Sequence, residues 1–255
     1  MMLAYLQTEI KVLFRKKLYL IISIFLPVVF YLLFTSLLDL PSAAAQKFYK
    51  EYMYSMTVFS LMSFCLMSFP LDMIEERTSG WFRHLMSTPL TATKYFTVKI
   101  FRAMIQFALA IIVIFTVGHF YKNVTMDLQS WLFSGLILWL GASLFLTFGL
   151  VIAQFKDAQK ASSFANILNL SLAIIGGLWF PVNTFPEWLQ NISTKTPTYH
   201  LKLIAYDLGK GEGVNLESFG VLIIYSIIFL GIALYINKKE MWNNYEKKRL
   251  GCSSR

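Results

Sequence analysis

Long apolar runs, separated by short polar stretches, follow one another along the whole chain. A helix needs roughly 20 apolar residues to cross the hydrocarbon core of a membrane. Six runs have about that length: 19–40, 53–73, 100–120, 131–154, 163–181 and 217–237. They are continuous, whereas the strands of a membrane β-barrel alternate between apolar and polar residues. Because lipid offers the backbone no hydrogen-bond partner, continuous runs predict helices. The pattern therefore predicts an all-α integral membrane protein with six transmembrane helices.

The polar stretches predict further features of a single transmembrane domain over residues 1–255. Residues 1–17 repeat apolar side chains at helical spacing, which is typical of an amphipathic helix in the headgroup layer. Residues 74–90 predict a short cytoplasmic helix between the second and third spans. Residues 182–216 predict short extracellular or re-entrant helices between the fifth and sixth spans. Residues 238–255 form a basic cytoplasmic tail.

Composition and charge support this topology. The chain is 56% hydrophobic and only 15% charged, whereas soluble domains carry about 25% charged residues. Most Lys and Arg residues fall in the two terminal segments and the two loops that would share their side, so both termini are expected in the cytoplasm. The net charge of +9 then matches anionic bilayer lipid, and no compact basic domain suggests nucleic acid. Lys94, Lys99 and Arg102, at the foot of the third run, are expected to reach the headgroups.

The start of the chain resembles a signal peptide, with basic residues, an apolar run and small residues after it. Its apolar run exceeds the roughly 7–15 residues of a signal-peptide core, which favours a retained span. The two cysteines, Cys65 and Cys252, fall mid-span and in the tail, so no intramolecular disulfide is expected.

The sequence lacks the motifs that ion coupling, metal binding and nucleotide binding require. No Asp, Glu, Lys or Arg lies in the centre of a predicted span, which disfavours an ion-coupled carrier, although carbonyl or hydroxyl groups could still bind sodium. The three histidines, His84, His119 and His200, are scattered and predict no metal site. The chain also lacks the glycine-rich loop that binds nucleotide phosphates. It is therefore predicted not to be an enzyme, and any energy for active transport must enter through a partner.

Residues 75–90 are the strongest candidate for contact with such a partner. Four bulky apolar residues are expected on one helical face: Trp81, Phe82, Leu85 and Met86. Glu75 and Glu76 are expected near the start of this helix, where the dipole favours anions, and Pro89 marks its end. The helix either lies on the inner leaflet or inserts its apolar face into a groove of a cytoplasmic protein, and periodicity does not separate these alternatives.

Two pairs of residues are candidates for a substrate path. Asn166 and Asn169 are three residues apart in the fifth run and are expected on one face. They serve either as polar contacts between helices or as substrate contacts. Met62 and Met67 belong to a methionine-rich second run, for which ordinary packing is favoured over a role in binding varied apolar substrates.

Two motifs resemble those of the ABC-2 family of exporter permeases. The first has the spacing Glu-x-x-x-Gly-x-x-x-x-Leu-x-x-x-Pro-Leu, and its residues are Glu76, Gly80, Leu85, Pro89 and Leu90. The second precedes the last run and consists of Gly177, Pro181, Pro186, Trp188, Leu189, Pro197 and Tyr199. The two motifs occur in order within a chain of six predicted spans, so the resemblance covers nearly the whole chain.

The resemblance implies a half-transporter that pairs with a second permease, identical or related. It also implies two separate ATP-binding subunits, so ATP and Mg would be held by the partner and this chain would need no cofactor of its own. The implied ATPase-coupling residues are Glu75, Glu76, Arg77, Gly80, Trp81, Phe82, Leu85 and Pro89. The implied extracellular gate contains Gly177, Phe180, Pro181, Phe185, Pro186, Trp188, Pro197 and Tyr199. Trp81-Phe82 departs from the smaller Thr-Leu pair that is frequent in the family.

The resulting hypothesis is a membrane permease that exports a lipophilic or amphipathic substrate, such as a drug, peptide or lipid, by alternating access. The absence of charge from the centre of the predicted spans suggests this substrate class. Two alternatives remain open: a membrane scaffold or sensor that does not transport, and an ion-coupled secondary carrier.

Overall fold

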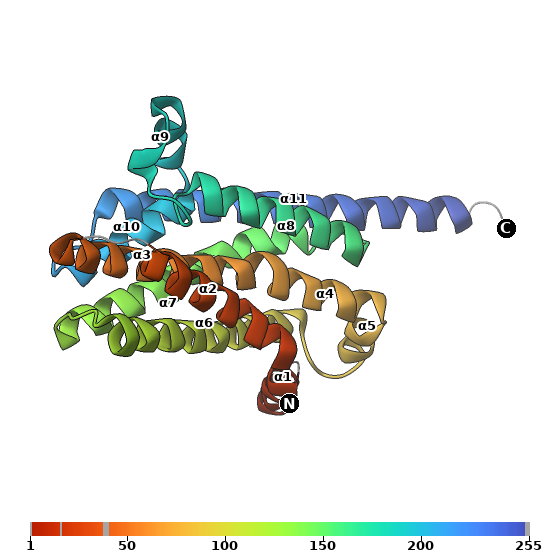
Figure 1. Cartoon of the computed structure of the whole chain (residues 1–255). Helices are drawn as coiled ribbons and strands as arrows, with labels where there is room; N and C mark the ends of the chain where they lie inside the picture. Colours follow the sequence, from red (N-terminus) through yellow and green to blue (C-terminus); the bar gives the residue numbers. More distant parts are fainter. Residues whose placement is uncertain (1, 16, 38–40, 253–255) are drawn as a thin grey trace.

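The computed structural model is a bundle of helices (Figure 1). It describes residues 2–15, 17–37 and 41–252. Within these ranges, only the backbone is described for residues 17–20, 22, 42, 43 and 237–252. The α-helices are α1 (Met2–Arg15), α2 (Lys17–Leu37), α3 (Ser42–Ser63), α4 (Phe69–Thr78), α5 (Trp81–Met86), α6 (Ala92–Lys122), α7 (Leu128–Ile152), α8 (Ala158–Ile175), α9 (Glu187–Ser193), α10 (Pro197–Gly209) and α11 (Leu216–Cys252). A π-helical turn, η1 (Phe64–Ser68), joins α3 to α4, and a 3₁₀ turn, η2 (Val182–Thr184), precedes α9. These described residues contain no strand, which confirms the all-α prediction.

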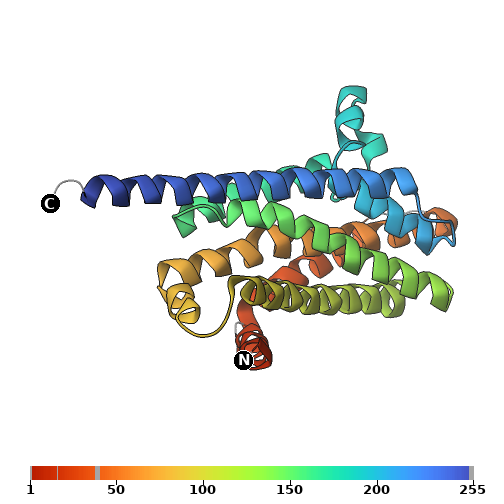
Figure 2. The ribbon, with the colours of Figure 1, turned by 180° about the vertical axis from the view of Figure 1, so that it is seen from behind.

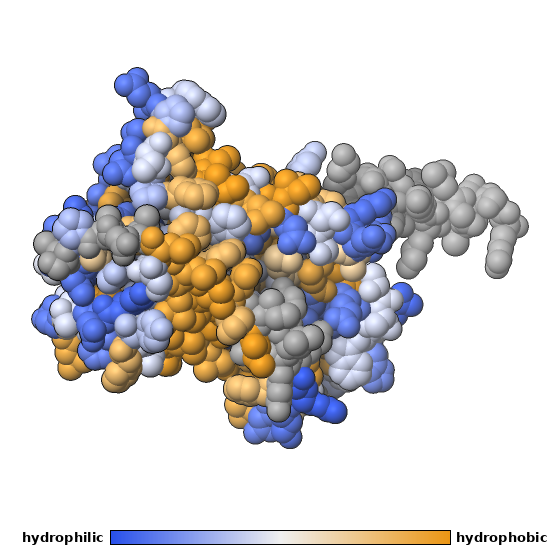
Figure 3. Space-filling model, in the orientation of Figure 1, coloured by the Kyte–Doolittle hydropathy of each residue, from blue (hydrophilic) through white to orange (hydrophobic). Residues whose placement is uncertain are grey.

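Four helical stretches within the described residues are long and apolar enough to cross a membrane: Ala44–Thr78, Ala92–Lys122, Leu128–Ile152 and Leu216–Ile236. The first combines α3, η1 and α4 into one continuous rod. On the face seen in Figure 3, apolar surface covers the middle of the bundle, and hydrophilic residues gather towards its ends. The integral membrane character is thus supported, whereas the predicted count of six spans is not confirmed. The two remaining runs form α2, of which Ser23–Leu37 is a shorter apolar helix, and α8, which has 18 residues.

The part of the rod made by α3 and η1 forms the centre of the core. It packs against α2, α6, α7, α8 and α10, and Met53, Met56 and Phe64 are almost completely buried there. Tyr54 donates a hydrogen bond from its hydroxyl to Ser134 Oγ of α7, at 2.8 Å. The methionine-rich run is therefore packed inside the protein along much of its length. This placement explains why the run is apolar on all sides.

The π-helical turn depends on a close approach by α7. A Cβ atom added to Gly149 would lie 2.3 Å from the carbonyl oxygen of Cys65 and 2.9 Å from the ring of Phe69. Only glycine leaves space for this backbone contact. Cys65 also donates from its thiol to the carbonyl oxygen of Ala142, at 3.5 Å. Small residues on α7 thus let two spans meet closely, as is typical of membrane helices.

The segment before α11 contains the two short helices that the sequence predicts, but they lie differently. Glu187–Ser193 forms α9, which projects sideways from the bundle in both ribbon views (Figures 1 and 2). By contrast, α10 packs against α3, α7 and α11 and buries much of its surface. Only α9 therefore has the free position expected of a helix on a membrane surface.

The opposite end of the bundle holds α5 and the start of α6. Here α1 lies roughly crosswise to the spans (Figure 1) and contacts α6. Such an orientation suits the predicted interfacial helix, whose membrane placement stays a prediction. The backbone of α11 extends beyond the bundle on the α5 side (Figures 1 and 2). The side chains of the tail, including that of Cys252, are not among those that the structure describes.

We expect Gly149→Ala to destabilise the protein by about 1–3 kcal/mol, because the new methyl group must displace backbone of η1. Gly135→Ala on the same helix is the matched control, since its Cβ would meet Phe115 at an ordinary 3.6 Å. The control should be neutral or slightly stabilising through helix propensity. Chemical denaturation of the purified protein in mild detergent measures both, and equal stability of the two variants would contradict the packing argument.

Candidate functional site: α5 and the buried ion cluster behind it

The segment 75–90 is two helices rather than one. The rod ends at Thr78, and Gly80 follows with φ of 80°, a left-handed conformation that strains any residue with a side chain. The six-residue helix α5 then starts at Trp81 in a new direction. Consequently Glu76 lies in the last turn of α4, and the prediction that it stands near the start of the short helix is wrong, as it is for Glu75. A glycine at this position permits the sharp turn that carries α5 away from the rod.

The structure divides the four apolar residues predicted to share one face. Leu85 is buried in a small cluster with Tyr5 of α1 and Tyr95 of α6, and Phe82 packs edge-on against Tyr95 with 5.1 Å between ring centroids. Met86 joins the same cluster. Trp81 instead keeps 44% of its surface exposed. Only one of the four is therefore free for a large contact with another protein.

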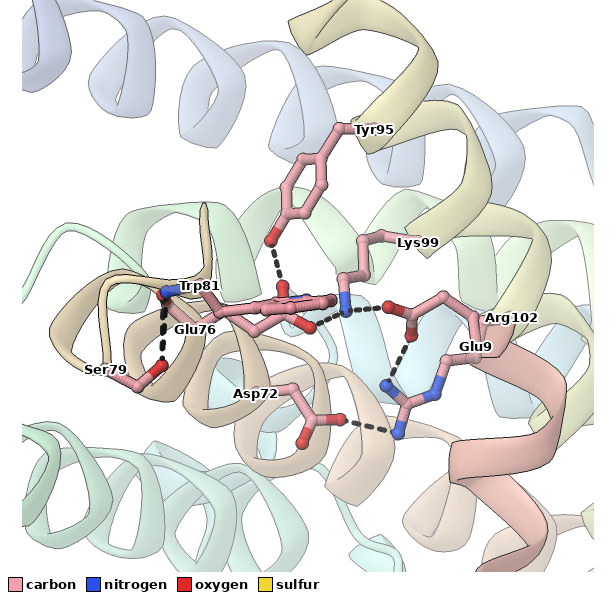
Figure 4. Close-up of polar contacts among 8 residues, drawn as sticks. All are labelled: Glu9, Asp72, Glu76, Ser79, Trp81, Tyr95, Lys99 and Arg102. Carbon is pink, nitrogen blue, oxygen red and sulfur yellow. Dashed lines mark hydrogen bonds and ion pairs between the residues drawn. The ribbon is translucent and has the colours of Figure 1, made fainter. Parts of the chain in front are cut away.

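An ion cluster lies directly behind α5 (Figure 4). Lys99 Nζ is 2.9 Å from Glu9 Oε1 and 2.5 Å from Glu76 Oε1. Arg102 bridges the other oxygen of Glu9 at 2.9 Å and Asp72 at 2.7 Å. The cluster thus joins three helices: α1 through Glu9, α4 through Asp72 and Glu76, and α6 through Lys99 and Arg102.

Tyr95 completes the cluster by donating its hydroxyl hydrogen to Glu76 Oε2, at 2.6 Å (Figure 4). The exposed fractions of the Lys99, Arg102 and Glu9 side chains are only 2%, 6% and 4%. Removing one partner from such a buried set leaves a charge without compensation, which is far costlier than losing a surface ion pair. The cluster is therefore expected to hold its three helices in one arrangement.

The electrostatics of α1 reflect this pairing. Burial alone would raise the pKa of Glu9, but Lys99 and Arg102 outweigh it and lower the pKa below its ordinary value. Burial and the neighbouring negative charge of Glu9 raise the pKa of the Tyr5 phenol. Glu9 is thus an ionised carboxylate and Tyr5 a neutral phenol at neutral pH. Among the described side chains, the charges buried at this end of the bundle are thus paired with one another.

Sequence reasoning missed this cluster. Lys99 and Arg102 were expected to reach the headgroups, and that prediction is wrong, because carboxylates from α1 and α4 satisfy them inside the protein. A local signal existed in α1, whose buried residues Tyr5, Glu9 and Leu13 recur every four positions. A carboxylate on the buried stripe of an amphipathic helix indicates a hidden cation.

The remaining residues predicted to couple to an ATPase lie around α5. Glu75 and Pro89 are exposed. Arg77 donates from its guanidinium to the backbone carbonyl of Phe155, which lies between α7 and α8. The predicted set is therefore one continuous region, but it serves two different surfaces: an inward surface at Glu76, Phe82 and Leu85, and an outward one at Trp81.

The predicted gate residues lie at the other end of the bundle and fall into two groups. Gly177, Phe180 and Pro181 line a narrow recess, and Pro181 and Tyr199 line a larger cavity beside it. Phe185, Pro186 and Trp188 instead lie at or near the projecting helix α9, where Trp188 is 65% exposed. Pro197 is buried at the start of α10. The structure thus does not bring Phe185 and Trp188 to the cavity.

The residues predicted for a substrate path are also separated. Asn169 is buried, and its amide nitrogen lies 3.2 Å from Ser63 Oγ of α3. Asn166 is exposed, so the two amides do not share an environment. Met62 lies in the packed core, and Met67 is half-buried. Asn169 therefore acts here as a polar contact between helices, and a substrate role for any of the four stays a prediction.

Comparison with known proteins identifies the family. The family model described as "ABC-2 family transporter protein" matches residues 37–235, which include both motifs. The chain belongs to the ABC-2 transporter family. It is also similar to "Putative transport permease YvfS" of Bacillus subtilis (strain 168), with 30% identity over 232 residues that cover 91% of this chain and 95% of that protein.

Membership of the ABC-2 family confirms the resemblance drawn from the two motifs. The chain is therefore a membrane permease of the ABC-2 family, a class of multi-pass membrane proteins that are not themselves enzymes, and membership of this family implies an ATPase partner. Within the described part of the chain, no group of His, Cys, Asp and Glu side chains is arranged to hold a metal ion.

We expect Glu9→Gln to loosen α1 from the bundle, because the neutral amide leaves Lys99 and Arg102 with less compensation. A loss of about 3 kcal/mol in the local opening free energy would speed amide exchange in α1 by about 100-fold. Hydrogen exchange with mass spectrometry measures this. Lys11→Gln, at an exposed position of the same helix, is the control and should leave the exchange unchanged. Equal exchange in both variants would show that the cluster does not hold α1.

Proposed function

We propose that this permease is the membrane subunit of an ATP-driven exporter and that α5 is the contact for a separate ABC ATPase. Two copies of the chain, or this chain and a related permease, would form the membrane part. Two ATPase subunits would bind ATP and Mg and dock on α5 from the cytoplasm. Both termini would then lie in the cytoplasm, because α1 and the end of α11 lie towards the α5 end (Figure 1).

The observation that carries this proposal is the division of α5 into an exposed and an anchored side. Trp81 lies at the tip of the rod with 44% of its surface exposed, and its ring is 5.6 Å from that of His84. Exposed tryptophans beside charged residues are frequent anchors of protein interfaces. Arg83 and His84 are also exposed, which gives this anchor a polar and basic rim.

The anchored side explains how a push on α5 would reach the membrane. Leu85 fixes α5 to α1 and α6, and Gly80 links it to the rod. The ion cluster then ties the end of the rod to α6 and α1 through Glu76 and Lys99. Because separating these charges in a buried site is costly, the three helices would move together. Closure of the ATPase subunits would thereby tilt the rod relative to α7.

The motif resemblance supports the direction of transport, and the composition of the spans supports the class of cargo. The resemblance of both motifs to exporter permeases supports outward transport by alternating access. The apolar rod and the absence of charged residues from the middle of the four candidate spans support a lipophilic or amphipathic cargo, such as a drug, peptide or lipid. A permanently charged group would find compensation only near the ends of the bundle.

We expect Trp81→Ala to reduce the amount of ABC ATPase that co-purifies with the tagged permease by at least about tenfold, because it removes the one large exposed anchor of α5. Trp188→Ala, which removes a tryptophan that is exposed at the other end of the molecule, is the matched control and should retain the ATPase. Purification from native membranes in mild detergent, followed by mass spectrometry, gives the ratio of the two subunits.

If the wild-type permease carries no ABC ATPase under these conditions, the proposed function is wrong and a scaffold or sensor role is favoured. If Trp81→Ala retains the ATPase as well as Trp188→Ala does, α5 is not the docking site. Leu85→Glu is unsuitable for this test, because Leu85 is buried and a charge there would disrupt the cluster with Tyr5 and Tyr95.

A further inference from the structure

A cavity of about 570 Å³ opens at the end of the bundle opposite α5. It lies between the first turns of α3, the turn η2 and the helix α10, and we call it the α10 cavity. Its lining includes the apolar surfaces of Phe48, Tyr199, Leu203 and Tyr206. On the face seen in Figure 3, hydrophilic residues predominate at this end of the molecule. The cavity therefore combines an aromatic wall with a polar mouth.

Three lysines and one carboxylate supply the charge of the lining. Lys47 comes from α3, Lys202 from α10 and Lys210 from the end of α10, while Glu51 is the single acidic residue. Lys210 lies 4.3 Å from the ring centroid of Tyr206 and also pairs with Asp207 at 3.5 Å and with Glu212 at 3.8 Å, outside the lining. The lining itself thus has an excess of positive charge.

Lys202 is the most informative of these residues, because it is buried and incompletely paired. Its ammonium group lies 3.4 Å from Glu51 Oε1 and 3.1 Å from the carbonyl oxygen of Gly177. A well-formed bond between an ammonium and a carboxylate is about 2.7–2.9 Å long. Burial lowers the pKa of Lys202, and Glu51 only partly opposes this. An additional anion would stabilise the charged amine.

A recess beside the cavity adds a second unsatisfied group. It shares Phe48, Glu51 and Lys202 with the cavity and has room, about 10 Å³, for one water-sized group. Tyr52 lines it and is 4% exposed, yet its hydroxyl finds no hydrogen-bond partner among the described residues. Buried hydroxyls are normally paired, so a ligand atom or a water is expected here.

We propose that the α10 cavity binds the anionic group of an amphiphile, a phosphate or carboxylate, between Lys47, Lys202 and Lys210. The hydrocarbon part would lie against the wall formed by Phe48, Tyr199 and Leu203. Inorganic phosphate alone would use the lysines but would leave this wall without a partner. The inference goes beyond the proposed function and needs no ATPase, so the two can fail separately.

The test titrates the purified full chain, in neutral maltoside detergent, with dodecyl phosphate and counts bound molecules by native mass spectrometry. One molecule per chain is expected, with much weaker binding of dodecylphosphocholine, which has the same hydrocarbon chain but no net charge. Lys202→Gln should weaken dodecyl phosphate binding about tenfold, and Lys47→Gln or Lys210→Gln about threefold, because these two are more exposed. Lys195→Gln, an exposed lysine outside the lining, is the control and should change nothing.

Glu51→Gln provides a test of opposite sign. It removes the carboxylate that competes for Lys202, so binding should tighten about threefold, a result that misfolding would not produce. Equal binding by the wild type and all these variants would overturn the proposal, as would equal binding of the zwitterionic probe. Displacement of the probe by an equal concentration of inorganic phosphate would overturn the role of the apolar wall.

A competition experiment distinguishes the two possible ligands, a membrane lipid and a single-chain anionic amphiphile. If phosphatidylglycerol displaces dodecyl phosphate, the cavity binds the headgroup of a membrane lipid. If phosphatidylglycerol does not displace it, the cavity selects single-chain anionic amphiphiles. Both results retain the anion site and differ only in which molecule fills it.

Discussion

The arrangement of this permease depends on the pairing of buried charges at the α5 end of its long central rod. Glu9, Lys99, Arg102, Asp72 and Glu76 come from three helices and are joined by contacts of 2.5 to 2.9 Å. None of these helices can be displaced alone without leaving an uncompensated charge in a poorly hydrated site. The crosswise helix α1 is therefore part of the packed structure. Its position in turn buries Leu85 and fixes the orientation of α5.

This constraint gives a very short helix one anchored side and one exposed side. In six residues, α5 presents Trp81 to the surroundings and Leu85 to the interior. A helix this short has little stability of its own and depends on tertiary contacts. Gly80, in a left-handed conformation, turns the chain so that both contacts are possible. The two neighbouring aromatic residues therefore differ in their surroundings: Trp81 remains exposed, and Phe82 packs against Tyr95.

The buried lysines at the two ends of the bundle have different partners. Lys99 has two carboxylates at short distance, whereas Lys202 has one at 3.4 Å and a backbone carbonyl. The first arrangement is complete and is typical of a structural contact. The second leaves charge available beside an open cavity, as binding sites do. Because the middle of the apolar spans offers no charge to compensate an anion, the proposed site for the anionic group of an amphiphile lies in the α10 cavity, beside Lys202.

The sequence by itself determined the all-α membrane class, the short helices before the last span and the family. These features depend on composition, periodicity and local spacing, which a single chain displays directly. Only the tertiary structure decided that Lys99 and Arg102 are buried, that Leu85 faces inward, that Asn166 and Asn169 differ and that three lysines share a cavity. Glu9 is 90 residues from Lys99 along the chain. The buried stripe of α1 indicates a hidden cation, but no local pattern identifies Lys99, because the pairing depends on how the helices pack against one another.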